Sequence, residues 1–207
     1  YYIFGNDDPA SALLFFDEPV ISNLMTYINM QVIENSVIEI GGYACIPPTP
    51  FLLKDWEKYD ISRYVPRGGL SPEEGIRTVE IPMNIIKHTT IADDLEILHG
   101  KFQNVRNSIC LFHAPPYDTN LDKMLGRDIN GNLQVTGVGS MAIRKFIEKY
   151  KPAVTLHGHI HESAEISGSW QDKLGETFCF SAGHTCEELA LVSFDTDNPS
   201  AAVRLLL

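Results

Sequence analysis

Two histidines separated by one residue carry the clearest chemical signal in this sequence. The segment 156–161 reads LHGHIH and follows a short apolar run. In an extended chain the side chains at i and i+2 leave the same face, so His159 and His161 can reach neighbouring points. Gly158 removes a side chain where the backbone bends or approaches another group. Because imidazole binds zinc, iron, manganese and related ions, the pair predicts a metal site without naming the metal.

Two further polar motifs follow apolar stretches. Residues 5–8 read GNDD, and residues 112–116 read FHAPP. Asn6 offers an amide oxygen and His113 an imidazole, and both groups bind divalent ions. Loops at the ends of strands usually build the sites of α/β proteins. We therefore expect Asn6 and His113 to join His159 and His161 in one cleft.

Helices and strands alternate between these motifs and must position them. The spacing of apolar residues and the positions of Gly and Pro predict helices at 10–16, 91–102 and 139–150 and a long connection at 54–82. The same signals predict strands at 1–5, 37–46, 108–112, 153–156, 178–180, 189–194 and 203–206. This order predicts an α/β domain around a mixed sheet. The first strand reads as already under way at Tyr1, so we expect upstream sequence.

Length and charge narrow the classes of function. The 207 residues suit one domain, 1–207, which we expect to be incomplete at its N-terminus. The formal net charge of −11 argues against nucleic acid and anionic membranes as partners. The negative charge does not exclude a small phosphorylated substrate, because bound cations can supply local positive charge. With no signal peptide or long apolar span in the sequence, we expect a cytoplasmic protein.

Cys45, Cys110 and Cys179 lie in apolar, strand-like runs, and we expect them to be buried structural thiols. A turn and a helix cap are expected at 118–122, after the two prolines that follow His113. His157, next to the metal-binding pair, is interpreted as structural.

In their order along the chain, the three motifs resemble the calcineurin-like metallophosphoesterase superfamily. Its pattern runs Asp-x-His, Gly-Asp-x-x-Asp, Gly-Asn-His-Asp/Glu, a lone His and Gly-His-x-His. The last three blocks match residues 5–8, His113 and residues 158–161. The resemblance implies a layered α/β/β/α-type domain with mixed sheets that lacks its first strands here. It also implies a metal-dependent phosphoesterase that hydrolyses a phosphomonoester or phosphodiester with a metal-activated hydroxide.

The resemblance also assigns roles to individual residues. Asn6, His113 and His159 match ligands of the second metal, and His161 matches a ligand of the first. The implied cofactors are two divalent ions, of Mn, Fe, Zn or Ni, which activate water and stabilise charge on the phosphoryl oxygens. Loops after strands host sites, so we predict that His184, in such a loop, contacts substrate.

Two departures from the family pattern matter. The first two blocks are absent from this sequence, so we expect a missing N-terminal segment or a partner chain to complete the first metal site. Asp7 stands where the family has His near the leaving group. It could donate a proton only when its carboxyl is protonated, and it would otherwise repel phosphate. Asp8 matches the acidic position that orients the preceding residue, so Asp7 and Asp8 are the catalytic candidates.

Two alternative functions remain. A nuclease of the same fold is weakened by the acidic balance and by the lack of a basic stripe. A catalytically inactive binding or scaffold module would explain both the absent ligands and Asp7, because a fold does not by itself imply its chemistry.

Overall fold

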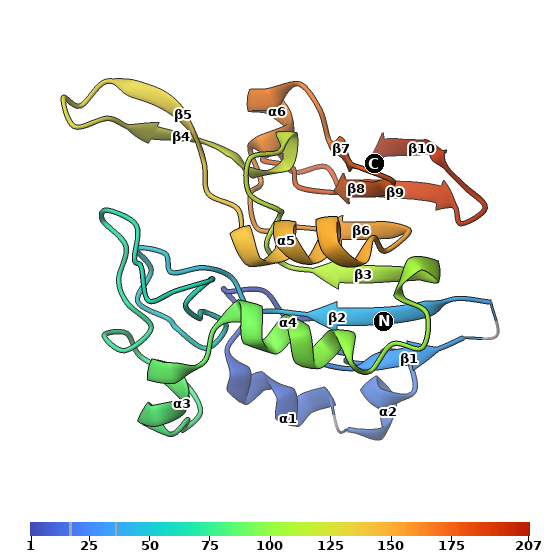
Figure 1. Cartoon of the computed structure of the whole chain (residues 1–207), viewed down its shortest axis with the longest axis horizontal. Helices are drawn as coiled ribbons and strands as arrows, with labels where there is room; N and C mark the ends of the chain where they lie inside the picture. The colour runs from blue at the N-terminus through green and yellow to red at the C-terminus, as the bar shows by residue number, and fades with distance from the viewer. Residues whose placement is uncertain (17, 36) are drawn as a thin grey trace.

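A six-stranded mixed sheet forms the centre of the protein (Figure 1), in a computed structural model that describes residues 1–16, 18–35 and 37–207. The strand order is β1-β2-β3-β6-β8-β7. The four inner strands are parallel, and each edge strand is antiparallel to its neighbour. The strands are β1 (Val32–Glu34), β2 (Glu39–Tyr43), β3 (Ser108–Phe112), β6 (Val154–His157), β7 (Gln171–Leu174) and β8 (Thr177–Ser181). The predicted α/β class is confirmed.

Side chains alternate along the strands and bury both faces of the sheet. On β3, Cys110 and Phe112 face one core, and Ile109 and Leu111 face the other. Buried parallel strands need cover on both sides, and their near-continuous apolar sequence reflects this.

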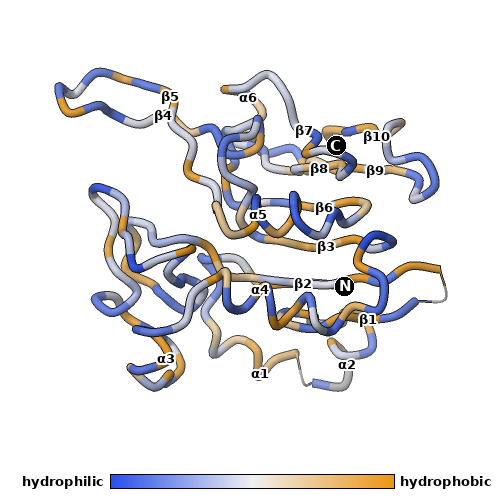
Figure 2. Tube along the Cα trace, in the orientation of Figure 1, coloured by the Kyte–Doolittle hydropathy of each residue, from blue (hydrophilic) through white to orange (hydrophobic). Residues whose placement is uncertain are grey.

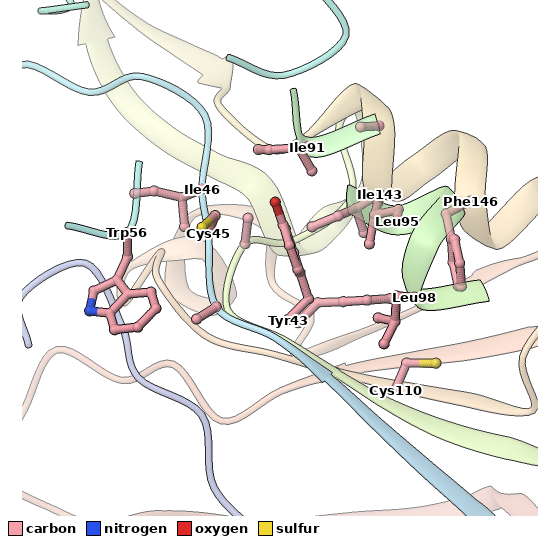
Figure 3. Close-up of a cluster of buried hydrophobic side chains, with 14 of the residues drawn as sticks. Tyr43, Cys45, Ile46, Trp56, Ile91, Leu95, Leu98, Cys110, Ile143 and Phe146 are labelled. Carbon is pink, nitrogen blue, oxygen red and sulfur yellow. The ribbon is translucent and has the colours of Figure 1, made fainter. Parts of the chain in front are cut away.

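Two helices cover the first face. They are α4 (Ile91–His99) and α5 (Met141–Tyr150), which pack on each other in front of β2 and β3 in Figure 1. Figure 3 shows Leu95, Leu98, Ile143 and Phe146 converging on Tyr43. Hydrophilic and hydrophobic residues alternate along α5 (Figure 2), as expected for a helix with one buried face. None of the helices in the described part of the chain combines the length and the apolar character that crossing a bilayer requires.

A two-stranded antiparallel hairpin lies against the other face. It consists of β9 (Ala190–Asp195) and β10 (Asn198–Leu206). Its Val192, Phe194 and Ala202 pack with the second core, which includes Val154 and Phe180 of the sheet. The sheet is therefore enclosed between a helical layer and a hairpin.

The remaining elements are short. A second hairpin, β4 (Lys123–Arg127) with β5 (Leu133–Gly137), projects from the body in Figure 1. The others are η1 (Ala10–Ala12), α1 (Leu13–Phe16), α2 (Pro19–Ser22), α3 (Met83–His88), η2 (Val105–Asn107), η3 (Asn120–Asp122) and α6 (Ser163–Ser167). Between β2 and α3 the chain has neither helix nor named strand, which confirms the predicted long connection.

One predicted strand is wrong. Residues 1–5 do not join the sheet; Tyr2 forms only an isolated bridge with Tyr27. The Tyr2 backbone N–H donates to Thr26, and its carbonyl accepts from Ile28. The apolar residues of this segment instead serve an aromatic cluster, in which Phe4 packs near Trp56. Burial of aromatic rings thus produced the apolar pattern that resembled a strand.

Candidate metal centre

Two neighbouring parallel strands deliver the three histidines of the predicted site. His113 directly follows β3, and His159 and His161 follow β6. β3 and β6 are adjacent, so their carboxyl ends meet at one edge of the sheet. Backbone bonds lock this edge, because Gly158 N–H donates to the carbonyl of His113 at 3.1 Å. Asn6 reaches the same edge from the turn at residues 5–8.

Three of the four predicted ligands converge on one point. Asn6 Oδ1 lies 2.9 Å from His113 Nε2 and 2.8 Å from His159 Nδ1. Ligand atoms at right angles around an ion lie roughly 2.8 to 3.1 Å apart when each is about 2.0 to 2.2 Å from it. Each imidazole nitrogen is therefore at hydrogen-bond distance of the Asn6 amide oxygen, which is also the spacing of two neighbouring ligands of one divalent ion. The chemistry of the three groups fits a transition metal.

The carboxamide of Asn6 is held in the orientation that this geometry needs. Its Nδ2 donates to Asp7 Oδ1 at 3.0 Å, which turns Oδ1 toward the two imidazoles. Asp8 Oδ2 accepts from the Gly5 N–H at 2.7 Å and closes the turn. Trp56 Nε1 donates to the Asp8 carbonyl at 2.8 Å, so the long connection buttresses the same turn. Trp56 is thus a buried anchor of the loop.

The side chain of Asp8 binds within its own turn. Its carboxylate accepts from the Gly5 N–H at 2.7 Å and from the Tyr2 hydroxyl at 3.4 Å. The turn places the Asp8 carboxylate over the backbone of the residues before it. Asp8 therefore shapes the turn, and Asp7 orients Asn6.

His159 adopts an unusual backbone conformation. Its φ of 66° lies in the left-handed region, which a side chain with a Cβ rarely occupies. Such a conformation costs of order 1–3 kcal/mol and persists only where the surroundings impose it. Here it follows Gly158 and turns the His159 ring toward Asn6. Strain of this kind concentrates at ligand-binding positions.

Burial keeps the two converging imidazoles neutral. Desolvation lowers the pKa of His113 to about 4, although the carboxylates of Asp8 and Asp7 partly oppose this shift. Desolvation, reinforced by the neighbouring His113 and His161, lowers the pKa of His159 to about 3. A neutral imidazole has a free lone pair, so both rings are in the state that a metal requires near neutral pH.

His161 lines the same cavity but stands apart from the other ligands. The cavity has a volume of about 300 Å³ and is lined by Tyr2, Ile3, Gly5, Asn6, Asp7, Asp8, His113 and His161. His161 is exposed. Within the described residues, no group of the three imidazoles has all its ligand atoms within 4.8 Å of one another. The described chain thus groups three ligand atoms at one point and leaves His161 beside them.

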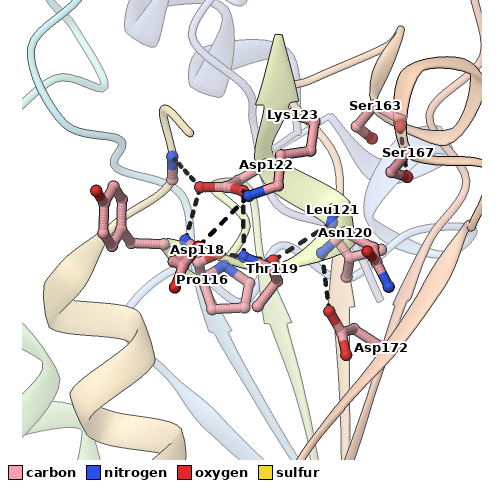
Figure 4. A network of polar contacts seen from close by, with 12 residues as sticks. Pro116, Asp118, Thr119, Asn120, Leu121, Asp122, Lys123, Ser163, Ser167 and Asp172 are labelled. Atoms are coloured by element: carbon pink, nitrogen blue, oxygen red, sulfur yellow. Dashed lines mark hydrogen bonds and ion pairs between the residues drawn. The ribbon is translucent and has the colours of Figure 1, made fainter. Parts of the chain in front are cut away.

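The loop after His113 is tied down by a buried carboxylate. Asp122 Oδ2 accepts from the backbone N–H groups of Asp118 at 2.8 Å and Gly139 at 3.2 Å, and Oδ1 accepts from Thr119 at 3.2 Å (Figure 4). Thr119 and Asp122 form the expected turn and helix cap at η3. This carboxylate joins the segment that leaves β3 to the segment that enters α5.

The other predicted residues have clear positions. Asp7 and Asp8 both line the cavity. His184 does not; it lies in the loop between β8 and β9, where its ring faces Glu188 of the same loop and Glu165 of α6. His157 is buried, with Nδ1 2.9 Å from the Ala114 carbonyl oxygen, as expected for a structural histidine. Tyr2, Ile3 and Gly5 line the cavity without having been predicted, although the apolar run before Asn6 placed them beside it.

Comparison with known proteins supports the fold without naming an activity. No family model matches the chain. Over 99 residues it is 35% identical to an uncharacterised protein, MJ1162, of Methanocaldococcus jannaschii, and the match covers 46% of this chain but only 40% of that relative. A crystal structure of TT1561 from Thermus thermophilus aligns with this chain at 15% identity and a TM-score of 0.54. The alignment covers 99% of this chain and 71% of the TT1561 chain. Another crystal structure aligns at 14% identity and a TM-score of 0.58, and the alignment covers 99% of this chain and 64% of the chain in that structure.

Proposed function

We propose that this protein is a metal-dependent phosphoesterase, and that its domain has the layered metallophosphoesterase fold. The observation that carries the proposal is the convergence of Asn6 Oδ1, His113 Nε2 and His159 Nδ1. These atoms belong to the residues that the motif resemblance assigned to one metal. They come from three separate parts of the sequence, so their proximity results from the fold and not from adjacent positions in the chain.

The cavity walls explain why cations are needed. Asp7 and Asp8 line the cavity, and the lining residues of the described chain include neither Lys nor Arg. A phosphate entering such a cavity would be repelled by the two carboxylates, with no Lys or Arg in the lining to offset them. Divalent ions, when bound, would reverse this charge, polarise the phosphoryl oxygens and acidify a bound water. The residues of the chain contribute ligand atoms, orientation and partial exclusion of solvent.

Each residue has a specific task in this proposal. His113 and His159 hold the ion through neutral nitrogens, and Asn6 adds a neutral oxygen, so much of the ion's charge stays available to phosphate. Asp7 keeps the Asn6 carboxamide oriented. His161, exposed in the same cavity, serves the other of the two divalent ions, of Mn, Fe, Zn or Ni. A small phosphomonoester or phosphodiester suits a cavity of about 300 Å³.

We propose that another segment or a partner chain completes the site of His161. A catalytic zinc-type site normally has about three protein ligands, and the described cavity offers His161 without two more imidazole, thiolate or carboxylate groups in ligand spacing.

The test combines metal analysis with hydrolysis. The protein, purified together with the segment or partner chain that completes the His161 site, is assayed by elemental analysis and against p-nitrophenyl phosphate and bis(p-nitrophenyl) phosphate, with and without a chelator. We expect hydrolysis that disappears with chelator and returns with Mn²⁺ or another divalent ion. His159→Ala should lose more than about a hundredfold in turnover, since even residues that only support ligands contribute 10- to 100-fold. His88→Ala, at an exposed position on α3, is the matched control.

An inactive binding module is the second candidate, because His161 lacks partners within the described residues. It predicts that Asn6, His113 and His159 together bind one equivalent of metal and that the protein hydrolyses neither ester. Hydrolysis that survives complete metal removal would contradict both candidates.

A further inference from the structure

We propose a second, separate metal site at the loop between β8 and β9, formed by His184, Cys186 and Glu188 and suited to zinc. The ligand atoms of these three side chains all lie within 4.8 Å of one another. Around a tetrahedral zinc, ligand atoms are roughly 3.3 to 3.8 Å apart, given bonds of about 2.0 to 2.3 Å. The three groups therefore need to close by about an ångström, which exposed side chains of a loop can do.

The pair of His184 and Glu188 is already at ligand spacing. His184 Nε2 lies 3.3 Å from Glu188 Oε2. The His184 side chain is only 12% exposed, so its ring is held in place, whereas Cys186 and Glu188 are exposed and free to adjust. A fixed imidazole with two adjustable ligands at i+2 and i+4 suits capture of an ion from solvent.

A carboxylate stands behind the imidazole. On the far side of the ring, His184 Nδ1 faces Glu165 Oε1 at 3.9 Å. Glu165 lies on α6 and also accepts from the Thr185 hydroxyl, which fixes it to the same loop. Metal-bound histidines almost always direct their second nitrogen to a carboxylate or carbonyl, which sets the tautomer and strengthens the ligand. Glu165, which is independent of the three ligands, is beyond hydrogen-bond distance at 3.9 Å and would take this role by approaching Nδ1 by about an ångström.

The ligand types select the metal. Thiolate, imidazole and carboxylate together suit zinc and disfavour magnesium and calcium, which prefer oxygen ligands. Cys186 and Glu188 border a surface cavity of about 460 Å³, so the fourth position is open to water. The loop also begins beside the first site, since Gly183 packs against the backbone of His161. An ion here would fix the loop that borders His161.

Cobalt provides a test that the first site cannot imitate. A thiolate bound to Co²⁺ gives a near-ultraviolet charge-transfer band, and the first site has no sulfur ligand. The other three cysteines are buried. When the full chain is titrated with Co²⁺, this band should saturate at one thiolate-bound ion per chain. Intense visible bands of tetrahedral Co²⁺ should appear with it, and added Zn²⁺ should abolish both sets of bands. Cys186→Ser should remove the charge-transfer band, and Glu188→Gln should weaken Co²⁺ binding at least about tenfold.

Glu187→Gln is the matched control, because Glu187 carries the same charge in the same loop but is outside the ligand group. Its band and affinity should equal those of the unmodified protein. No thiolate band in the unmodified protein, or a band that persists in Cys186→Ser, would overturn the proposal. Hydrolysis of phosphate esters plays no part in this readout, so the second site stands or falls independently of the phosphoesterase proposal.

Discussion

The imidazole of His113 rests directly on the backbone of Gly5. A Cβ at position 5 would lie 2.6 Å from His113 Cε1 and 2.8 Å from Nε2, closer than real Cβ contacts come. The same Nε2 is 2.9 Å from Asn6 Oδ1. The missing side chain of Gly5 is therefore what lets residues 5–6 reach His113, which lies 107 positions from Asn6 in the sequence.

Gly5→Ala should displace the His113 ring and weaken metal binding. The added methyl group must push away an imidazole that is packed beneath it, at a cost of about 1–3 kcal/mol in overpacking. Because the displaced nitrogen is a ligand atom, we expect Mn²⁺ or Zn²⁺ affinity to fall roughly 10- to 100-fold, measured by calorimetric titration.

Gly100→Ala is the control for the glycine substitution. Gly100 caps α4 at a φ of −62°, and its nearest atom to an added Cβ is 3.5 Å away. It should leave metal affinity unchanged. Unchanged affinity in Gly5→Ala itself would mean that His113 does not bind the metal through Nε2 in this position.

Asp7 can be tested for two different roles. If it orients Asn6, Asp7→Ala frees the carboxamide and should weaken metal binding roughly 10- to 100-fold. Asp7→Asn keeps an acceptor oxygen for Asn6 Nδ2 and should restore most of that affinity. If Asp7 instead donates a proton during hydrolysis, Asp7→Asn should bind metal normally and lose turnover.

The readout is a pair of measurements, metal affinity and kcat on p-nitrophenyl phosphate. Equal loss of affinity in both variants would exclude the orienting role. Normal values of both quantities in both variants would remove Asp7 from the site altogether.

Asp122 should contribute strongly to stability. It is fully buried, and its carboxylate accepts from the backbone N–H groups of Asp118, Thr119 and Gly139. Asp122→Ala would leave these donors without their partner in the interior, at a cost of about 2 to 5 kcal/mol. Urea unfolding at equilibrium measures this cost as a lower midpoint with little change in slope.

The exposed Asp197, in the turn between β9 and β10, is the control. Asp197→Ala should change the free energy of unfolding by less than about 0.5 kcal/mol. A cost for Asp122→Ala no larger than this would show that water replaces the carboxylate easily at this position.

The sequence predicted the site better than it predicted the first strand. Asn6, His113 and His159 are polar residues that follow apolar stretches, which makes them easy to recognise in the sequence. The order of the strands brings them to one edge of the sheet. Helix α5 was predicted from a clear amphipathic pattern that Lys151-Pro152 end, and in the structure Ser140 caps its beginning. Amphipathic patterns and helix-ending residues act locally, so they predict a helix without knowledge of its tertiary contacts.

What failed depended on tertiary contacts. The apolar residues at 1–5 serve an aromatic cluster with Trp56, and a short apolar run cannot reveal which partner buries it. The hairpin β4–β5 escaped prediction because its strands are largely exposed and have Gly126 and Gly137 within them. The grouping of Cys186 and Glu188 with His184 arises from the bend of a loop, which spacing alone does not specify.

The four cysteines should differ sharply in reactivity. Burial raises the pKa of Cys45 and Cys110 to about 12 and that of Cys179 to about 11. The thiolate is the reactive form, so these three are both inaccessible and almost entirely protonated at pH 8. Cys186 is exposed.

We expect iodoacetamide to modify Cys186 alone in the folded, metal-free protein, and all four cysteines in urea, as counted by mass spectrometry. Modification of Cys110 or Cys179 at a comparable rate under native conditions would mean that the central sheet opens frequently. That result would also contradict the packing of Cys110 and Cys179 in the core beneath α4 and α5.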